Sequence, residues 1–140
     1  MPMTRRDAMV LATGSVAACG LNAVPAWASA ADEAIAAFTG GAEPAEGGVV
    51  LDVAEIAENG NAVPIGVSAD GAVAILVVST ENPLPGVVTF RFGPLAASSS
   101  GSTRIRLARS QDVIAVAKME DGTFRRTSAS VKVTVGGCGG

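Results

Sequence analysis

Histidine and tyrosine are absent from this 140-residue chain, and aromatic residues make up only 4% of it. Without histidine, the chain lacks the commonest general base of enzymes and the commonest side-chain ligand of metal ions. A single sulfur with no companion ligands makes a poor metal site, so we expect neither a metal nor another cofactor. The composition therefore disfavours metal centres and histidine-based catalysis.

Positive charge and long apolar runs are also scarce. The chain has 10 basic and 13 acidic residues, a net charge of −3. Nucleic acids and anionic lipids attract proteins that carry a concentrated positive field, so neither is an expected partner. The longest apolar stretch, Ala8 to Ala18, is too short for the ~20 residues of a membrane-spanning helix.

Residues 1–30 have the layout of a bacterial export signal. A positive start with Arg5 and Arg6 precedes the apolar stretch, Pro25 follows it, and Ala28-Ser29-Ala30 offers the small residues of a cleavage site. The arginine pair predicts export by the twin-arginine route and a periplasmic location. Cleavage after Ala30 leaves a mature chain with eight basic and twelve acidic residues.

The chain has two cysteines, Cys19 and Cys138. Cys19 lies inside the signal and is expected to leave with it, although Val16 to Cys19 also fits a lipoprotein cleavage site. The mature protein then carries a single cysteine in an oxidising compartment. Such a cysteine either pairs between chains or is reactive.

Within the mature chain, the sequence of residues 31–135 predicts an all-β domain. A short helix is expected over Asp32–Phe38, with Asp32 as its N-cap and Gly40-Gly41 as its end. Asn59-Gly60, Asp70-Gly71, Asn82-Pro83 and Asp121-Gly122 mark turns between short β-rich runs. About seven strands without intervening helices indicate an antiparallel, immunoglobulin-like sandwich. The expected strands are Val49–Val53, Val63–Ser68, Val73–Ser79, Val87–Phe92, Thr103–Leu107, Val113–Met119 and Thr127–Val135.

The last expected strand runs directly into the C-terminal segment 136–140, Gly-Gly-Cys-Gly-Gly, which we call the arm. Val131, Val133 and Val135 share one face of that strand, so the arm starts from a rigid element and is expected to be free beyond it. Glycine adds no side chain and permits many backbone conformations. The arm thus presents the Cys138 thiol on a thin chain that can enter a narrow channel.

Cys138 has no cation, base or helix N-terminus beside it in the sequence that would activate its thiol. An accessible but unassisted thiol suits a covalent carrier whose partners supply the activation. Three other interpretations stay open: an intermolecular disulfide in a structural subunit, a thiol enzyme such as a sulfurtransferase, and an inert terminal segment. We expect the arm to be flexible because of its four glycines, Gly136, Gly137, Gly139 and Gly140.

Charged groups elsewhere are interpreted as solvated surface. Arg104 and Arg106 share a strand face, and with Arg109 they offer an alternative anion site. Arg125-Arg126 follows the turn predicted at Asp121-Gly122. The carboxylates Asp52, Glu55 and Glu58 lack the contrasting environments that divide catalytic pairs into acid and base.

Several sequence blocks resemble the SoxY family, the substrate-carrying subunits of the periplasmic thiosulfate-oxidising system. The blocks are the ending 131–140, and the stretches 55–64, 92–95, 103–107 and 113–119. The resemblance implies that Cys138 takes the place of the sulfur-bearing cysteine. It also implies a heterodimer with a SoxZ-like β-sandwich subunit, and visits to a c-type cytochrome, a hydrolase and a sulfur dehydrogenase.

Overall fold

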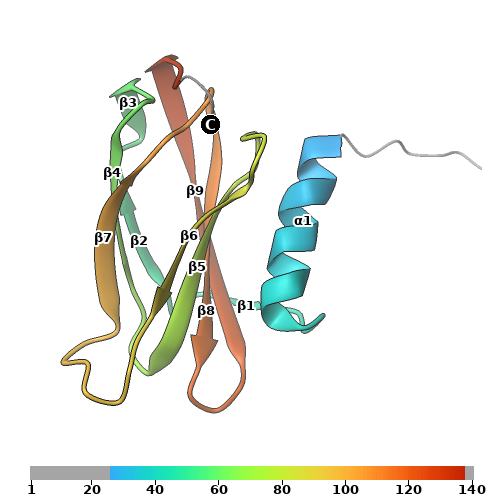
Figure 1. Ribbon diagram of the computed structural model, residues 1–140, viewed down its shortest axis with the longest axis vertical. Coiled ribbons are helices and arrows are strands. Elements are labelled where there is room, and N and C mark those ends of the chain that lie inside the picture. The colour runs from blue at the N-terminus through green and yellow to red at the C-terminus, as the bar shows by residue number, and fades with distance from the viewer. Residues whose placement is uncertain (1–25, 138–140) are drawn as a thin grey trace, which may run out of the picture.

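The computed structural model describes residues 26–137, with side chains from residue 30 onward. Cys138, Gly139 and Gly140 lie outside the described residues, as does most of the predicted export signal. One helix is followed by strands that form two facing sheets (Figure 1). The elements are α1 (Ala26–Thr39), β1 (Ala45–Glu46), β2 (Val50–Val53), β3 (Ile56–Asn59), β4 (Val63–Ser68), β5 (Ala72–Ser79), β6 (Gly86–Arg91), β7 (Ser100–Ile105), β8 (Gln111–Met119) and β9 (Phe124–Val135).

The two sheets form the predicted immunoglobulin-like sandwich. The larger has the order β1-β9-β8-β5-β6, with β3 also paired to β9, and the smaller has the order β2-β4-β7. Most pairs are antiparallel, but β1 and β3 pair with β9 in parallel. The sequence analysis did not predict these two short strands. These two parallel pairs need no crossover helix, because strands β4 to β8 lie between β3 and β9 in the sequence and make the connection.

Strands β5 and β8 are buried on both faces because each lies between two apolar layers. On β5, Ile75 and Val77 point into the space between the sheets, whereas Leu76 and Val78 point to the opposite face. Strand β8 repeats the pattern with Val113 and Ala115 inside the sandwich. A continuous apolar run, rather than strict alternation, is the sequence pattern of such a doubly covered strand.

Helix α1 provides the second layer by packing on the outer face of the larger sheet (Figure 1). Ala31 and Ile35 are buried there, and the rings of Phe38 and Phe124 meet edge-to-face at 5.9 Å. The helix begins at Ala26 rather than near Asp32, so Asp32 is an exposed residue inside it and the predicted N-cap is wrong. Among residues 26–137, no helix is long and apolar enough to cross a membrane.

Glycines end the helix and shape two hairpin turns as predicted. Gly40 has a φ of 66°, and the amide of Gly41 donates to the Ala36 carbonyl at 3.1 Å, which closes the helix C-terminus. Gly71 and Gly122 also have positive φ angles, of 78° and 84°. These conformations are accessible to glycine without the steric penalty that a Cβ atom brings.

Beside the second hairpin turn, Asp121 accepts hydrogen bonds from Thr123. The Thr123 hydroxyl donates at 2.6 Å and its amide at 2.9 Å, both to Oδ1 of Asp121. The side-chain bond and then the backbone bond lower the pKa of Asp121, because both favour the charged carboxylate. This carboxylate stabilises the turn and is fully exposed.

Candidate functional site at the root of the arm

Strand β9 carries the chain to the end of the sandwich at which the arm begins. Its inward-facing valines become progressively more exposed, from Val131 at 2% through half-buried Val133 to Val135 at 60%. Beyond Val135, the structure describes Gly136 and Gly137, which we call the arm root. Cys138, the predicted site of covalent attachment, is the next residue.

Three backbone hydrogen bonds in series connect the arm root to the rest of the domain. The amide of Gly60 donates to the Val135 carbonyl at 2.7 Å, and the amide of Leu107 donates to the Gly60 carbonyl at 2.8 Å. The amide of Gly137 then donates to the Leu107 carbonyl at 2.9 Å. These bonds join the end of β9, the β3–β4 turn and the segment after β7 into one junction.

The junction requires glycine because backbone atoms occupy the places where side chains would start. A Cβ on Gly60 would lie 2.8 Å from the Gly137 nitrogen, and a Cβ on Gly137 would lie 2.8 Å from the Gly60 carbonyl oxygen. A Cβ on Gly136 would collide with the Ala108 carbonyl oxygen. None of the three has a positive φ, so close approach of the backbones, not an unusual backbone conformation, selects glycine here.

This geometry corrects two sequence-based interpretations. The chain was expected to be free beyond Val135, but the Gly137 amide is hydrogen-bonded to Leu107. Asn59-Gly60 was interpreted only as a turn, yet Gly60 is a buried contact of the arm root. The sequence signal for Gly60 was its turn chemistry, which does not reveal a partner that lies 77 residues later in the chain.

Two buried amide side chains hold the segment after β7 in place. The Asn82 Nδ2 atom donates to the Arg106 carbonyl at 2.7 Å, and its Oδ1 accepts from the Ala108 amide at 3.0 Å. The Gln111 Nε2 atom donates to Asn82 Oδ1 at 2.9 Å and to the Arg109 carbonyl at 3.0 Å. Asn82 is only 3% exposed and Gln111 only 7%, so these bonds lie in a protected interior.

We expect Asn82→Ala to destabilise the domain by about 2–3 kcal/mol, since it leaves the Arg106 carbonyl and the Ala108 amide without their buried partner. Urea unfolding followed by circular dichroism measures the change. Ser102→Ala, at an exposed position of β7, is the matched control and should change stability by less than about 0.5 kcal/mol. Equal stability of the two variants would contradict the assigned role of Asn82.

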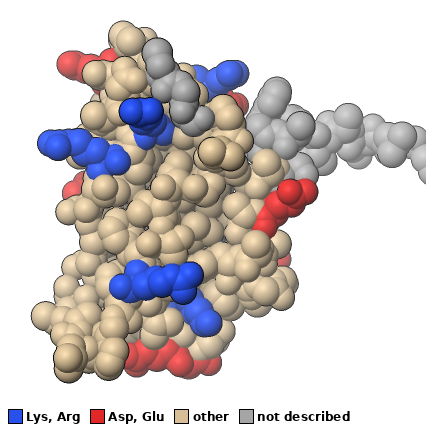
Figure 2. Space-filling view, in the orientation of Figure 1, with Lys and Arg blue, Asp and Glu red and all other residues tan. Residues whose placement is uncertain are grey.

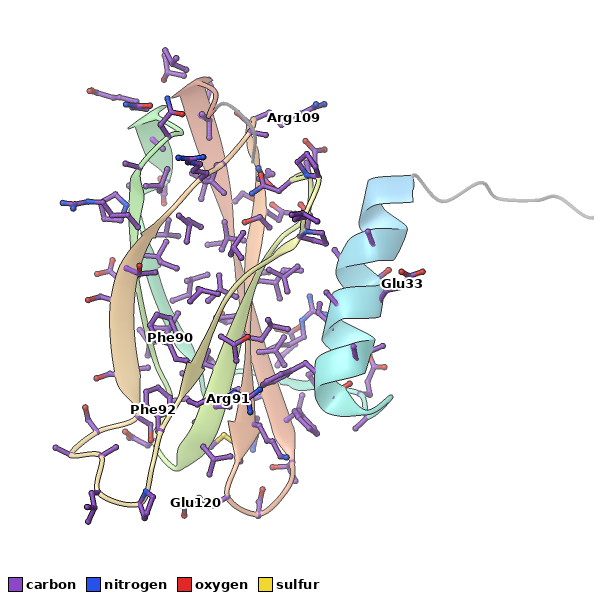
Figure 3. The ribbon with its side chains drawn as sticks, in the orientation of Figure 1. Glu33, Phe90, Arg91, Phe92, Arg109 and Glu120 are labelled. Atoms are coloured by element: carbon purple, nitrogen blue, oxygen red, sulfur yellow. The ribbon has the colours of Figure 1, made fainter. Side chains whose placement is uncertain are left out.

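Arg104 lies on β7 and is exposed, and Arg106 and Arg109 follow that strand. Arg106 and Arg109 flank Leu107 and Ala108, the residues in contact with the arm root, and both side chains are exposed. Figure 3 shows Arg109 at the upper end of the sandwich. Arg125-Arg126 lies near the start of β9, where Arg126 pairs with Glu46 at 3.1 Å.

The remaining candidate residues do not form a site. Asp52, Glu55 and Glu58 are all exposed, on β2, before β3 and on β3. Within residues 26–137, no group of three or more acidic, histidine or cysteine side chains is arranged to hold a metal ion. The interpretation of these three carboxylates as surface groups agrees with their exposure.

Two comparisons identify relatives of this chain, whereas no curated protein matches it. Residues 35–138 match the family described as sulfur oxidation protein SoxY. The solved structure of the sulfur carrier protein SoxY from Chlorobium limicola f thiosulfatophilum is 33% identical, with a TM-score of 0.68. That alignment covers 76% of this chain and 94% of the Chlorobium chain.

More distant structures share the fold alone. The superoxide reductase (neelaredoxin) from Ignicoccus hospitalis aligns at 13% identity and a TM-score of 0.54, over 62% of this chain and 80% of its own. A variant of the neelaredoxin from Archaeoglobus fulgidus aligns at 12% identity and 0.50, over 60% and 86%. The sequence match and the Chlorobium structure agree, and they show that this chain belongs to the SoxY family of sulfur-oxidation proteins, which supports a role as a sulfur carrier.

Proposed function

We propose that this protein is a periplasmic carrier that holds sulfur-oxidation intermediates covalently on Cys138 and presents them to partner enzymes. The observation that carries the proposal is the continuity of β9 with the arm: a rigid 12-residue strand leads through two packed glycines to the cysteine. The family match extends to residue 138 and so includes this cysteine. The export signal predicted in residues 1–30 supports the periplasmic location.

The proposed chemistry uses the thiol as a handle. The Cys138 thiolate and the thiosulfate dianion join through an S–S bond, giving a thiosulfonate monoanion and two electrons, which a c-type cytochrome accepts. Hydrolysis with one water then releases sulfate and two protons and leaves a persulfide. A sulfur dehydrogenase oxidises the outer sulfur to a sulfonate with three oxygens from water, releasing six protons and six electrons, and a c-type cytochrome accepts these electrons. A second hydrolysis with one water releases sulfate and two protons and regenerates the thiolate.

In this proposal the chain is a substrate carrier and its partners perform the catalysis. The sequence contains no histidine, and the carboxylates considered for acid–base roles are exposed and separate. Activation of the thiol or of its bound sulfur is therefore assigned to the partner active sites. An arm built from glycine suits several such sites, because it carries no bulky group adapted to only one of them.

A SoxZ-like subunit completes the proposed assembly as a heterodimer. Strand β6 ends the larger sheet, and the large apolar residues before and after it, Leu84 and Leu95, are 75% and 97% exposed. Natural proteins usually pair or cover an open sheet edge, and exposed apolar side chains favour burial at an interface. These features support association of the sandwich with another β-rich subunit.

Intact-mass spectrometry of the protein purified from cells grown on reduced sulfur compounds tests the proposal. A carrier should show additions of sulfane sulfur, thiosulfonate or sulfonate that reductant removes and that fragmentation locates at Cys138. Protein from cells grown without those compounds is the control. A structural subunit instead shows only a disulfide between chains, and that result would replace the carrier assignment.

A further inference from the structure

The sandwich is open along one side, where β6 ends the larger sheet and β7 ends the smaller sheet (Figure 1). Among the described strands, β6 pairs with β5 alone and β7 with β4 alone. The two edges meet where the Phe90 ring covers Gly101, so closely that a Cβ on Gly101 would lie 2.5 Å from the ring. Beyond this contact the edges border an open hollow of about 340 Å³.

The hollow has an apolar lining and a basic border. Its apolar residues come from β6, from the loop before it and from the end of β7: Leu84, Val87, Val88 and Ile105. Arg104 and Arg106 also line it, both are exposed, and none of the described lining residues is acidic. Figure 2 shows basic side chains at the upper left of this face, the side on which β7 lies in Figure 1. A molecule that fills the hollow therefore needs apolar groups and negative charge.

Neither arginine is committed to a carboxylate in the part of the chain that the structure describes. The ion pair found there joins Arg126 to Glu46. The main chain that carries Arg104 is fixed by the pairing of β7 with β4, and the Arg106 carbonyl accepts from buried Asn82 at 2.7 Å. The two charges thus start from a rigid base and are available to carboxylates of another molecule.

Strand β6 also presents unpaired main-chain groups along its outer edge. The Phe92 amide donates to the Val73 carbonyl at 2.9 Å, in register with the antiparallel pairing of β5 and β6. The main-chain groups of an antiparallel strand alternate between its two sides, so those of Thr89 and Arg91 point away from β5. Both residues are exposed. An extended segment of another molecule can therefore add to β6 as a further strand.

We propose that this edge and hollow bind an extended, acidic segment of the partner subunit, which pairs with β6 as a further strand. An apolar side chain of the segment enters the hollow, and its carboxylates accept hydrogen bonds from Arg104 and Arg106. The main-chain bonds supply affinity, whereas the hollow and the two charges supply specificity. The inference rests on the proposed heterodimer, since it names the surface and the chemistry that join the two subunits.

A second copy of this chain fits the surface less well. An isologous contact along two β6 edges brings the same residues of both copies together, so Arg91, Arg104 and Arg106 would gather like charges. Like charges opposite one another destabilise a strand pair. The surface therefore favours a partner of opposite charge. Arg106 directly precedes Leu107, which bonds the arm root, so the docked partner lies at the end of the sandwich where the arm begins.

The first test measures the affinity of this protein for the purified SoxZ-like subunit of the same organism by isothermal titration calorimetry. In about 0.1 M salt, Arg104→Glu/Arg106→Glu should weaken binding at least about tenfold, because repulsion replaces attraction at the border of the hollow. Lys118→Glu/Arg125→Glu is the matched control, which makes the same charge change at exposed positions of β8 and β9. The control should bind within about twofold of wild type, since its charges are screened from the docking surface.

The second test addresses the strand pairing. Thr89→Pro removes an amide that faces the open edge, so it should weaken binding at least about tenfold while the pairing of β5 with β6 persists. Thr89→Val keeps the amide and should bind like wild type. Hydrogen exchange of the wild-type protein needs no substitution: the amides of Thr89 and Arg91 should exchange at least about tenfold more slowly once the partner is bound.

Equal affinity of the arginine variant and its control would overturn the docking surface. Unchanged exchange of both edge amides on binding would overturn it as well, as would a protein that binds only a second copy of itself. None of these results bears on the carrier function. Failure of that function would instead show as missing mass additions at Cys138, with the binding results unchanged.

Discussion

Cys138→Ser is expected to abolish thiosulfate-dependent electron transfer in a system reconstituted with the partner enzymes. A hydroxyl oxygen cannot form the S–S bond that links thiosulfate or sulfane sulfur to the carrier. The exchange changes one atom beyond the last described residue, Gly137, so the fold should be unaffected. Cytochrome reduction, followed by absorbance, measures the turnover, and it should fall to the level seen without the carrier.

Cys19→Ser is the matched control because it removes the other cysteine of the sequence. That variant should retain full turnover once the protein is exported, and both variants should unfold at the wild-type temperature. Retained electron transfer in Cys138→Ser would contradict the carrier function at its central step. Loss of turnover accompanied by a lower unfolding temperature would instead point to a structural role of the cysteine.

The strands were predictable because their patterns depend on local packing. All seven expected strands are present, and β5 and β8 show the long apolar runs of strands covered on both faces. The short strands β1 and β3 were missed, since each pairs in parallel with β9 across a large sequence separation. The helix was predicted too short, because its N-terminal part overlaps the residues assigned to the export signal.

The sequence suggests which residue carries the proposed chemistry, but it does not reveal how the root of the arm is built. Cys138 and its glycines stand out in the sequence, whereas the junction at the arm root depends on Gly60, Asn82 and Gln111. Asn82 had the sequence signature of a turn beside Pro83, yet it is buried and bridges the Arg106 carbonyl and the Ala108 amide. Long-range backbone contacts of this kind leave no periodic pattern in the chain.

The glycines on either side of Cys138 should therefore respond differently to substitution. In Gly137→Val the new Cβ would lie 2.8 Å from the Gly60 carbonyl oxygen, so the junction must shift, and we expect a loss of about 1–3 kcal/mol of stability. Gly139 lies outside the described residues, and Gly139→Val should leave stability within about 0.5 kcal/mol of wild type. Urea unfolding of both variants measures this contrast.

Loading by the partner enzymes should nevertheless fall more than tenfold in Gly139→Val. Valine adds a branched side chain and restricts the backbone beside the thiol, so a thicker and stiffer arm enters the partner active sites poorly. Reaction of Cys138 with iodoacetamide should stay near the wild-type rate, because that small reagent needs no channel. Gly139→Ala, with a smaller side chain, should lose less loading than the valine variant. If iodoacetamide reactivity falls in proportion to loading, the glycine acts on the thiol itself and the access argument is wrong.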